Sequence, residues 1–268
     1  MPTVTEPTLV DLSTLKRRDV ILGLASGALM LAGCETNAVT GRSQFIGLAP
    51  GEQQLAAMAL DSWAKQKQDT PISRDPALNA QLQRVGRRIS AASGLTNVQW
   101  EFVVFDKDDK NAFVLPGGKV GFYRGLMQLA QNDAQIAAVM GHEVGHVQAR
   151  HAAERYSQQV GSSLAMAGAQ VALASSQNAN AYMAAIGLGA QVGILLPYSR
   201  LQETEADRVG VDNMHRAGYD VREAVKFWEL MAGEGGSRGP TILSTHPSPQ
   251  GRMAELRAYI AQRGYAQM

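Results

Sequence analysis

The stretch that decides the fold is residues 133–148, Asp-Ala-Gln-Ile-Ala-Ala-Val-Met-Gly-His-Glu-Val-Gly-His-Val-Gln. Its apolar residues recur at helical spacing, and Asp133 is placed to cap the first turn, so we predict one long helix. His142 and His146 are four residues apart and therefore lie one above the other on a single face of that helix. The apolar stripe that faces the core comprises Ile136, Val139, Met140, Val144 and Val147.

Two histidines in this arrangement can bind one metal ion through their ring nitrogens. Glu143 directly follows the first histidine, so its carboxylate can reach water at the metal without being a ligand itself. This spacing, His142-Glu143-Val144-Gly145-His146, is the His-Glu-x-x-His pattern typical of zinc peptidases. A zinc site of this kind needs a third protein ligand, which must come from elsewhere in the chain.

Residues 199–208, Ser-Arg-Leu-Gln-Glu-Thr-Glu-Ala-Asp-Arg, predict a second helix that can supply this ligand. Glu203 and Asp207 are four residues apart and share a face, whereas Glu205 points to nearly the opposite side. One of the two can bind the metal while the other accepts the second ring N–H of a ligand histidine. The alternative for this pair is a solvated helix face that forms salt bridges with neighbouring arginines.

The rest of the chain predicts an α+β fold that is mostly α-helical, with a small three-stranded sheet. Strands are expected at residues 98–105, 111–115 and 119–122, which are rich in β-branched and aromatic residues. Helices are expected over residues 51–68, 75–94, 201–217, 221–231 and 250–262.

Residues 156–199 contain no charged side chain. We expect two helices there that are buried against the rest of the fold. The alternatives are a gate over a cleft or a surface that contacts lipid. Residues 233–240 predict a flexible loop.

The balance of charges excludes one class of partner. Lys and Arg number 25 and Asp and Glu 24, so the net charge of +1 gives no electrostatic reason to expect nucleic acid. The chain has one cysteine, so it cannot form an intramolecular disulfide. A single cysteine in an exported protein needs a specific explanation.

The N-terminus predicts an export signal that accounts for this cysteine. Lys16, Arg17 and Arg18 precede the uncharged run 20–33, which is shorter than the roughly 20 residues that a membrane-spanning helix needs. The run ends in Leu-Ala-Gly before Cys34, which resembles a bacterial lipobox, so we expect Cys34 to be lipidated. The arginine pair also fits a twin-arginine signal, with general secretion as the alternative route.

The predicted organisation has three parts. Residues 1–33 form a lipoprotein signal peptide, residues 34–50 a lipid-anchored tether, and residues 51–268 a soluble metallopeptidase domain. The expected location is the periplasmic side of the bacterial cell envelope. Glu35 follows the cysteine in place of the aspartate that is associated with retention at the inner membrane, which favours the outer membrane.

The two helical motifs together resemble the gluzincin metallopeptidases of the CAAX prenyl protease and HtpX type, over residues 51–262. The chain is most similar to the exported, lipid-anchored branch of that family. The resemblance implies a zincin-like fold with an active-site helix and one zinc ion per chain, bound by His142, His146 and Glu203. It also implies that Asp207 orients a ligand histidine.

The resemblance assigns roles outside these helices as well. His246, followed six residues later by Arg252, matches a pair that supports the transition state near the metal in the family. Because His246 lies in a loop, it could instead bind zinc in a resting state. The segment Asn111-Ala112-Phe113 resembles the family's edge strand, which pairs with the substrate backbone.

The function implied is that of a zinc-dependent endopeptidase that cleaves unfolded or misassembled envelope proteins, with Glu143 as the catalytic base. Members with a C-terminal helical-repeat domain use it to bind partners, and no such repeat domain is expected in this chain. One alternative is a lipid-anchored zinc scaffold or chaperone without proteolytic activity, in which His246 is the fourth ligand. Another is a non-catalytic lipid-binding protein, suggested only by residues 156–199.

Overall fold

Helices make up most of the structure, together with two small sheets, so the predicted α+β class is confirmed. The predicted signal peptide, the second half of the uncharged segment and the predicted loop 233–240 fall almost entirely outside the described residues. Among the described helices, none is both long enough and apolar enough to cross a membrane. The computed structural model describes residues 33–173, 199–233, 242, 246 and 249–265.

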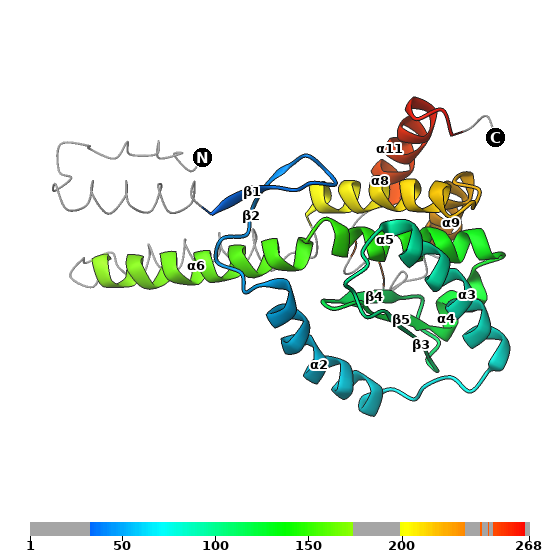
Figure 1. Cartoon of the computed structure of the whole chain (residues 1–268), viewed down its shortest axis with the longest axis horizontal. Helices are drawn as coiled ribbons and strands as arrows, with labels where there is room; N and C mark the ends of the chain where they lie inside the picture. The colour runs from blue at the N-terminus through cyan, green and yellow to red at the C-terminus, as the bar shows by residue number, and fades with distance from the viewer. Residues whose placement is uncertain (1–32, 174–198, 234–241, 243–245, 247–248, 266–268) are drawn as a thin grey trace, which may run out of the picture.

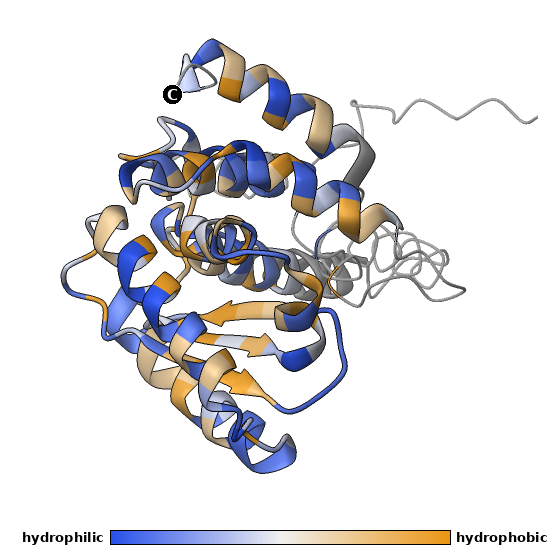
Figure 2. Ribbon diagram, turned by 90° about the vertical axis from the view of Figure 1, so that its right-hand side faces the viewer, coloured by the Kyte–Doolittle hydropathy of each residue, from blue (hydrophilic) through white to orange (hydrophobic). Residues whose placement is uncertain are grey.

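The three-stranded sheet consists of β3 (Glu101–Phe105), β4 (Ala112–Leu115) and β5 (Lys119–Tyr123). Its strand order is β3-β5-β4, with β3 parallel and β4 antiparallel to the central β5. All three strands lie where the sequence predicts them, although β3 begins at Glu101 instead of residue 98. Figure 2 shows that the strands are mainly hydrophobic, as expected for a sheet on which helices pack. β4 is an edge strand of this sheet.

Two helices precede the sheet, α2 (Glu52–Asp69) and α3 (Pro76–Ser93). The side chain of Asp75 caps α3 by accepting hydrogen bonds from two backbone amides of its first turn. Gly94 ends the helix with φ 73°, in the left-handed region that favours glycine. Both ends of α3 are therefore as the sequence predicts. α3 packs against β3 and against the central helix of the fold.

That central helix is α5 (Asp133–Gln148), and it runs beside α8 (Arg200–Arg216) (Figure 1). The two backbones come unusually close because small residues line the contact. A Cβ atom on Gly145 would lie 2.7 Å from the carbonyl oxygen of Ala206. One on Gly141 would lie 2.8 Å from that of Gly210. This close approach brings the acidic side chains of α8 up to the histidines of α5.

The cap of α5 differs from the prediction. Asn132, and not Asp133, is the N-cap, and its side chain accepts a hydrogen bond from the amide of Gln135 at 2.9 Å. Asp133 is instead the first helical residue and forms an ion pair with Arg84. Asn and Asp are equally good caps, so the sequence does not distinguish the two neighbours. The extended backbone of Asn132, with φ −159° and ψ 171°, decides between them.

The remaining helices surround this pair. α6 (His151–Leu173) follows α5 after a short turn and extends away from the body of the molecule (Figure 1). It covers the first half of the uncharged segment, for which a helix is predicted. α9 (Arg222–Gly233) and α11 (Pro249–Gln262) pack on each other, beside α5 and α8 respectively. The short α4 (Arg124–Leu129) is not predicted by the sequence.

Residues 34–45, within the predicted tether, contain two short strands. β1 (Cys34–Thr36) and β2 (Ser43–Phe45) form an antiparallel pair, called here the N-terminal hairpin, which lies beside the start of α6. The strands have three residues each and show no apolar alternation, so the sequence contains no strand signal. Their place in the fold depends on polar side chains that contact α5 and α6. Among these, Asn37 and Gln44 are buried.

Candidate metal centre

Four side chains from three parts of the chain converge at one point. One potential ligand atom from each of His142, His146, Glu203 and His246 lies within 4.8 Å of the others. The Nε2 atoms of His142 and His146 are 3.0 Å apart, and Nδ1 of His246 is 2.9 Å from Oε1 of Glu203. All four side chains are only 1–2% exposed. The solvated-face alternative for Glu203 is thereby excluded.

This donor set fits zinc. Imidazole nitrogens and a carboxylate oxygen are ligands that zinc accepts in a four-coordinate site. Each α5 histidine uses its Nδ1 atom to contact another side chain, so that both Nε2 atoms face the centre. Burial lowers the pKa of His146 well below its ordinary value, which favours the neutral form that binds metal.

His246 is held in place by the loop before β4. Its amide donates a hydrogen bond to the carbonyl of Ile242, whose own amide donates to the carbonyl of Lys110. The ring then lies with Nδ1 3.1 Å from Nε2 of His142. The structure thus places His246 among the potential ligands. Zinc binding in a resting state is one of the two roles that the sequence analysis leaves open for His246.

Glu143 lies beside this cluster without belonging to it. Its side chain is 1% exposed, and Oε1 is 3.7 Å from Nε2 of His246. That oxygen has no hydrogen-bond partner in the part of the chain that the structure describes. Burial raises the pKa of Glu143, although His246 and His142 oppose this effect. A buried carboxylate with a raised pKa is suited to accept and return a proton.

His142 is oriented by residues of α8 and α11, in the C-terminal part of the chain. Its Nδ1 lies 2.9 Å from Oδ1 of Asp207, and Arg252 donates to Asp207 through Nε at 2.7 Å and Nη2 at 2.6 Å. We call Asp207 and Arg252 the C-terminal support. The guanidinium of Arg252 stacks on the ring of Trp228 at 3.9 Å, and its Nη1 lies 3.0 Å from Glu203. The structure therefore places Arg252 against two carboxylates.

The charges of this cluster explain its pKa shifts. Burial alone would lower the pKa of His142, but the adjacent Glu203 carboxylate raises it to about 9. Burial would likewise raise the pKa of Glu203, yet the three neighbouring histidines hold it far below its ordinary value. Asp207 behaves in the same way, because Arg252 outweighs the effect of burial and lowers its pKa. Both carboxylates are therefore ionised at neutral pH.

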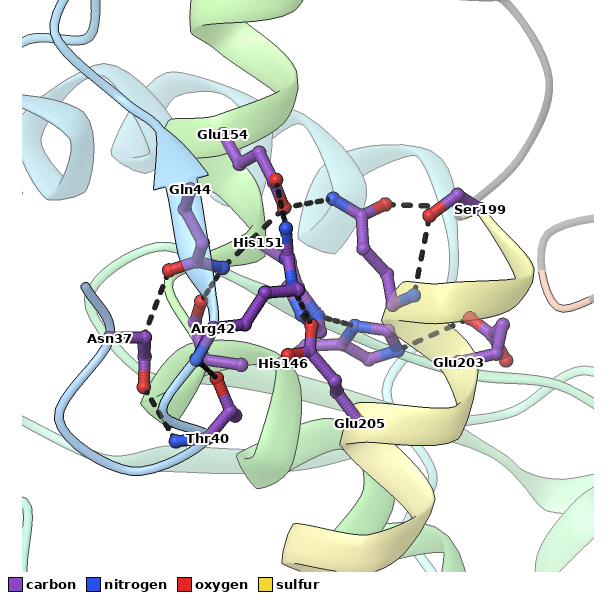
Figure 3. A network of polar contacts seen from close by, with 12 residues as sticks. Asn37, Thr40, Arg42, Gln44, His146, His151, Glu154, Ser199, Glu203 and Glu205 are labelled. Atoms are coloured by element: carbon purple, nitrogen blue, oxygen red, sulfur yellow. Dashed lines mark hydrogen bonds and ion pairs between the residues drawn. The ribbon is translucent and has the colours of Figure 1, made fainter. Parts of the chain in front are cut away.

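His146 is oriented from the opposite side, by a network that the sequence does not reveal (Figure 3). Its Nδ1 lies 2.8 Å from Nδ1 of His151, and Nε2 of His151 lies 3.1 Å from Oε2 of Glu205. Arg42 of the N-terminal hairpin donates to the same oxygen at 2.8 Å. We call His151, Glu205 and Arg42 the N-terminal support. Arg42 and Glu205 are 163 residues apart, so no local pattern connects them.

The strand that contains Ala112 and Phe113 packs against α5, the helix with the metal motif. Within the described residues β4 pairs on one side only, with β5, and the carbonyl of Asn111 accepts a hydrogen bond from the amide of Tyr123. Val114 and Leu115, at the end of β4, line a cavity of about 40 Å³ together with His146 and residues of α2 and α6. Ala112 and Phe113 occupy the first two positions of β4, as the sequence predicts for strand residues.

The fold and the site together define a zinc metallopeptidase. The profile of Peptidase family M48 matches residues 76–260, more than half of the chain. The chain belongs to peptidase family M48, and its cofactor is zinc. The gluzincin resemblance and the metalloprotease class expected from the sequence are therefore confirmed.

Individual relatives are consistent with this family. The chain is 35% identical over 185 residues to the mitochondrial metalloendopeptidase OMA1 of Schizosaccharomyces pombe, covering 68% of this chain and 52% of that protein. It is 32% identical over 194 residues to the beta-barrel assembly-enhancing protease of Escherichia coli, covering 70% of this chain and 40% of that protein. Over 232 residues it is 32% identical to OMA1 of Arabidopsis thaliana, covering 86% and 44% respectively. The chain thus spans about half the length of these relatives, or less.

Proposed function

We propose that this chain is a zinc-dependent endopeptidase of the bacterial cell envelope that cleaves unfolded or misassembled envelope proteins. The observation behind the proposal is the buried cluster of His142, His146, Glu203 and His246 beside the carboxylate of Glu143. The name of the Escherichia coli relative, a beta-barrel assembly-enhancing protease, supports the location in the envelope. We assign His142, His146 and Glu203 as the zinc ligands.

Each reacting group has a defined task in this proposal. Bound zinc supplies a Lewis acid that makes water more acidic and polarises the substrate carbonyl. Glu143 accepts a proton from the water that attacks the peptide carbonyl and passes it to the leaving amine. Asp207 holds His142 in the orientation of a ligand, and Arg252 keeps Asp207 and Glu203 in place.

The edge strand gives the enzyme a way to bind many sequences. Residues 111–113 would pair with an extended substrate as an added strand, which uses main-chain hydrogen bonds. Such binding requires an unfolded segment but no particular side chains. This agrees with misassembled proteins as substrates.

His246 gives the proposal a resting state. Nδ1 of His246 lies 2.9 Å from Glu203, so in this proposal its ring would serve as a fourth ligand and the site would be closed until His246 moves away. After it moves, His246 would help to stabilise the transition state. The same geometry favours a second candidate function, a zinc scaffold whose four-ligand site never opens.

We also propose that the chain is exported and anchored through lipid on Cys34, at the outer membrane. Cys34 is exposed and is the first residue of β1, so a lipid on it would not displace the core. In this proposal residues 1–33 are removed and residues 51–268 form the catalytic domain. Metabolic labelling with a fatty acid, compared between the wild type and Cys34→Ser, tests the anchor. Equal labelling of both would refute it.

Glu143→Gln separates the enzyme from the scaffold. We expect this change to keep zinc but to lower cleavage of an unfolded protein by at least about 100-fold, because it removes only the proton transfer. The mature protein and the variant would be loaded with one zinc and cleavage products followed by mass spectrometry. Equal turnover by both would show that Glu143 is not the base.

Two further variants test the zinc ligand Glu203 and the role of His246. Glu203→Ala is expected to lose zinc, and full zinc content in this variant would show that Glu203 is not a ligand. If the wild type binds zinc but cleaves nothing, His246→Ala distinguishes a latent enzyme from a scaffold. Cleavage by that variant would show a latent enzyme, whereas continued inactivity would favour the scaffold.

A further inference from the structure

A turn of only two residues brings the N-terminal support to His146. α5 ends at Gln148 and α6 begins at His151. Between them Arg150 has φ 54°, a left-handed conformation that is uncommon for a residue other than glycine. In an uninterrupted helix, residue 151 would be rotated by about 140° from residue 146 and could not contact it. The turn instead folds the ring of His151 back until it lies 2.8 Å from that of His146.

The N-terminal hairpin holds this turn from outside. Gln44 donates a hydrogen bond to the carbonyl of Ala149 at 2.7 Å, and Asn37 donates to that of Gln148 at 3.3 Å. The guanidinium of Arg150 forms ion pairs with Glu35 of β1 and with Glu52 of α2. The hairpin thus binds the carbonyls of the last residue of α5 and of its C-cap, at the end of the helix that contains the metal motif.

Arg42 connects the hairpin to two carboxylates of different elements. Its Nη1 and Nη2 bind both oxygens of Glu154 in α6 at 2.6 and 2.7 Å, while Nε binds Glu205 in α8 at 2.8 Å. The two carboxylates are 5% and 9% exposed and need a cation, because a buried carboxylate without a partner is unfavourable. Beyond Arg42 the two carboxylates have different hydrogen bonds: Glu205 contacts Nε2 of His151, whereas Glu154 accepts from Gln44 and Gln202.

The hydrogen bonds along this path have one consistent direction. When Nε2 of His146 faces the metal, its Nδ1 carries the proton and donates to Nδ1 of His151. Nε2 of His151 then carries the other proton and donates to Glu205. Each proton has one acceptor in this arrangement. The protons are assigned from the geometry, since each donor must face an acceptor.

We propose that His151 and Glu205, held by Arg42, are positioning residues that orient His146 for zinc, so that the N-terminal hairpin is part of the metal centre. The proposal rests on the proposed ligation of zinc by His146. A carboxylate hydrogen-bonded to a ligand histidine fixes its ring and its tautomer and makes it a better ligand. Here an intervening histidine transmits that effect from a carboxylate that cannot reach His146 itself.

Glu205→Gln and Glu154→Gln form a matched pair that tests this proposal. Each removes one charged partner of Arg42 and preserves the shape of the side chain. We expect Glu205→Gln to weaken zinc binding by about 10- to 100-fold, while Glu154→Gln leaves the zinc affinity unchanged. The full-length protein would be titrated with zinc in competition with a chromophoric chelator. Thermal unfolding of both variants would be measured in the same buffer.

A spectroscopic readout separates orientation from stability. With cobalt(II) in place of zinc, the visible absorption bands report the ligand geometry, and we expect them to shift in Glu205→Gln but not in Glu154→Gln. Equal losses of affinity in the two variants, or no loss in either, would overturn the proposal and leave the network a purely structural one.

His151 provides a test by rescue. His151→Leu removes the acceptor for His146, whereas His151→Asn can place an amide oxygen near the position of the lost Nδ1. We expect His151→Leu to weaken zinc binding and His151→Asn to recover part of the affinity. The same affinity in both variants would show that the hydrogen bond has no role.

His146→Ala is the control for the underlying assignment. If His146→Ala retains the affinity of the wild type, His146 is not a ligand and the proposed site fails. If His146→Ala loses zinc but Glu205→Gln does not, only the positioning role fails. Zinc affinity is measured without substrate, so these outcomes do not depend on peptidase activity.

Discussion

The two α5 histidines are held in different ways on the two sides of the metal centre. On the C-terminal side, His142 contacts Asp207 directly, and Arg252 is paired with that carboxylate. On the N-terminal side, Nδ1 of His146 contacts the ring of His151, whose Nε2 in turn contacts the carboxylate of Glu205. Both paths end in a carboxylate–arginine pair, but the two arginines differ in their contact with water. The side chain of Arg252 is 5% exposed and that of Arg42 is 20% exposed.

The two sides meet the same requirement by different arrangements. Each ligand histidine needs an acceptor for its second ring N–H. The α5–α8 packing already places Asp207 beside His142, so one carboxylate is sufficient there. On the opposite side Nδ1 of His146 contacts the ring of His151, which a turn and the N-terminal hairpin bring into place. We therefore expect the C-terminal support to tolerate less change than the N-terminal support.

Asp207→Ala should have the largest effect. It removes the acceptor for His142 and breaks the ion pair of the buried Arg252 with Asp207, while the ion pair with Glu203 stays. Breaking one side of a buried ion pair costs about 3–5 kcal/mol. Urea unfolding of the zinc-free protein would measure this loss. A smaller loss than that of Arg42→Met would contradict the expected order of the two supports.

Gly145→Ala should disturb both supports together, because both cross the contact between α5 and α8. The new methyl group would lie 2.7 Å from the carbonyl oxygen of Ala206, so the helices must separate. Overpacking of this kind costs about 1–3 kcal/mol and should also weaken zinc binding. Gly161→Ala in α6 is the matched control, since its nearest neighbours would be 3.6 Å away. Equal stability of the two variants would show that the close helix contact is unimportant.

Arg42→Met should have the smallest effect at neutral pH. We expect a loss of about 1.5 kcal/mol, the low end for hydrogen bonds to charged groups, because water reaches this arginine. Burial alone would raise the pKa of Glu154, but the hydrogen bond from Arg42 lowers it below 4.5. Burial opposes the shift of Glu205 as well, yet His151 and Arg42 bring its pKa to about 2.

These shifts fix the pH dependence of that variant. A carboxylate with a lowered pKa contributes stability that is fully present above its ordinary pKa and is lost as the pH falls through the folded value. The stability difference between the wild type and Arg42→Met should therefore be constant above pH 4.5 and shrink toward pH 2. Chemical unfolding of the zinc-free proteins across this range tests it. A difference that grows in acid would contradict the assignment of Arg42 to these carboxylates.

Patterns between neighbours in sequence account for what could be predicted. The spacing of His142, Glu143 and His146 places them on α5, and the i, i+4 spacing of Glu203 and Asp207 places both on one face of α8. A helix has a fixed geometry, so the relative positions of these residues follow from their numbers alone. The same reasoning predicts β3, β4 and β5 from short runs of β-branched and aromatic residues.

Other features could not be predicted because they depend on contacts between distant segments. The strands of the N-terminal hairpin are too short and too polar to show a pattern, and their position depends on Asn37, Arg42 and Gln44. Glu205 faces away from Glu203, as its spacing predicts. Its hydrogen bonds to His151 and Arg42 exist only because α6 folds back and the hairpin packs across it.

Spacing and motifs along the chain therefore predicted the class of the protein, the helix with the metal motif and the candidate zinc ligands. Each of these depends on spacing within a single helix or on a short motif. Only the tertiary structure decided how the ligand histidines are held, which arginine pairs with which carboxylate, and that residues 34–45 belong to the site. Buried charges need partners, and their position in the chain does not reveal which segments the packing of the fold will bring to them.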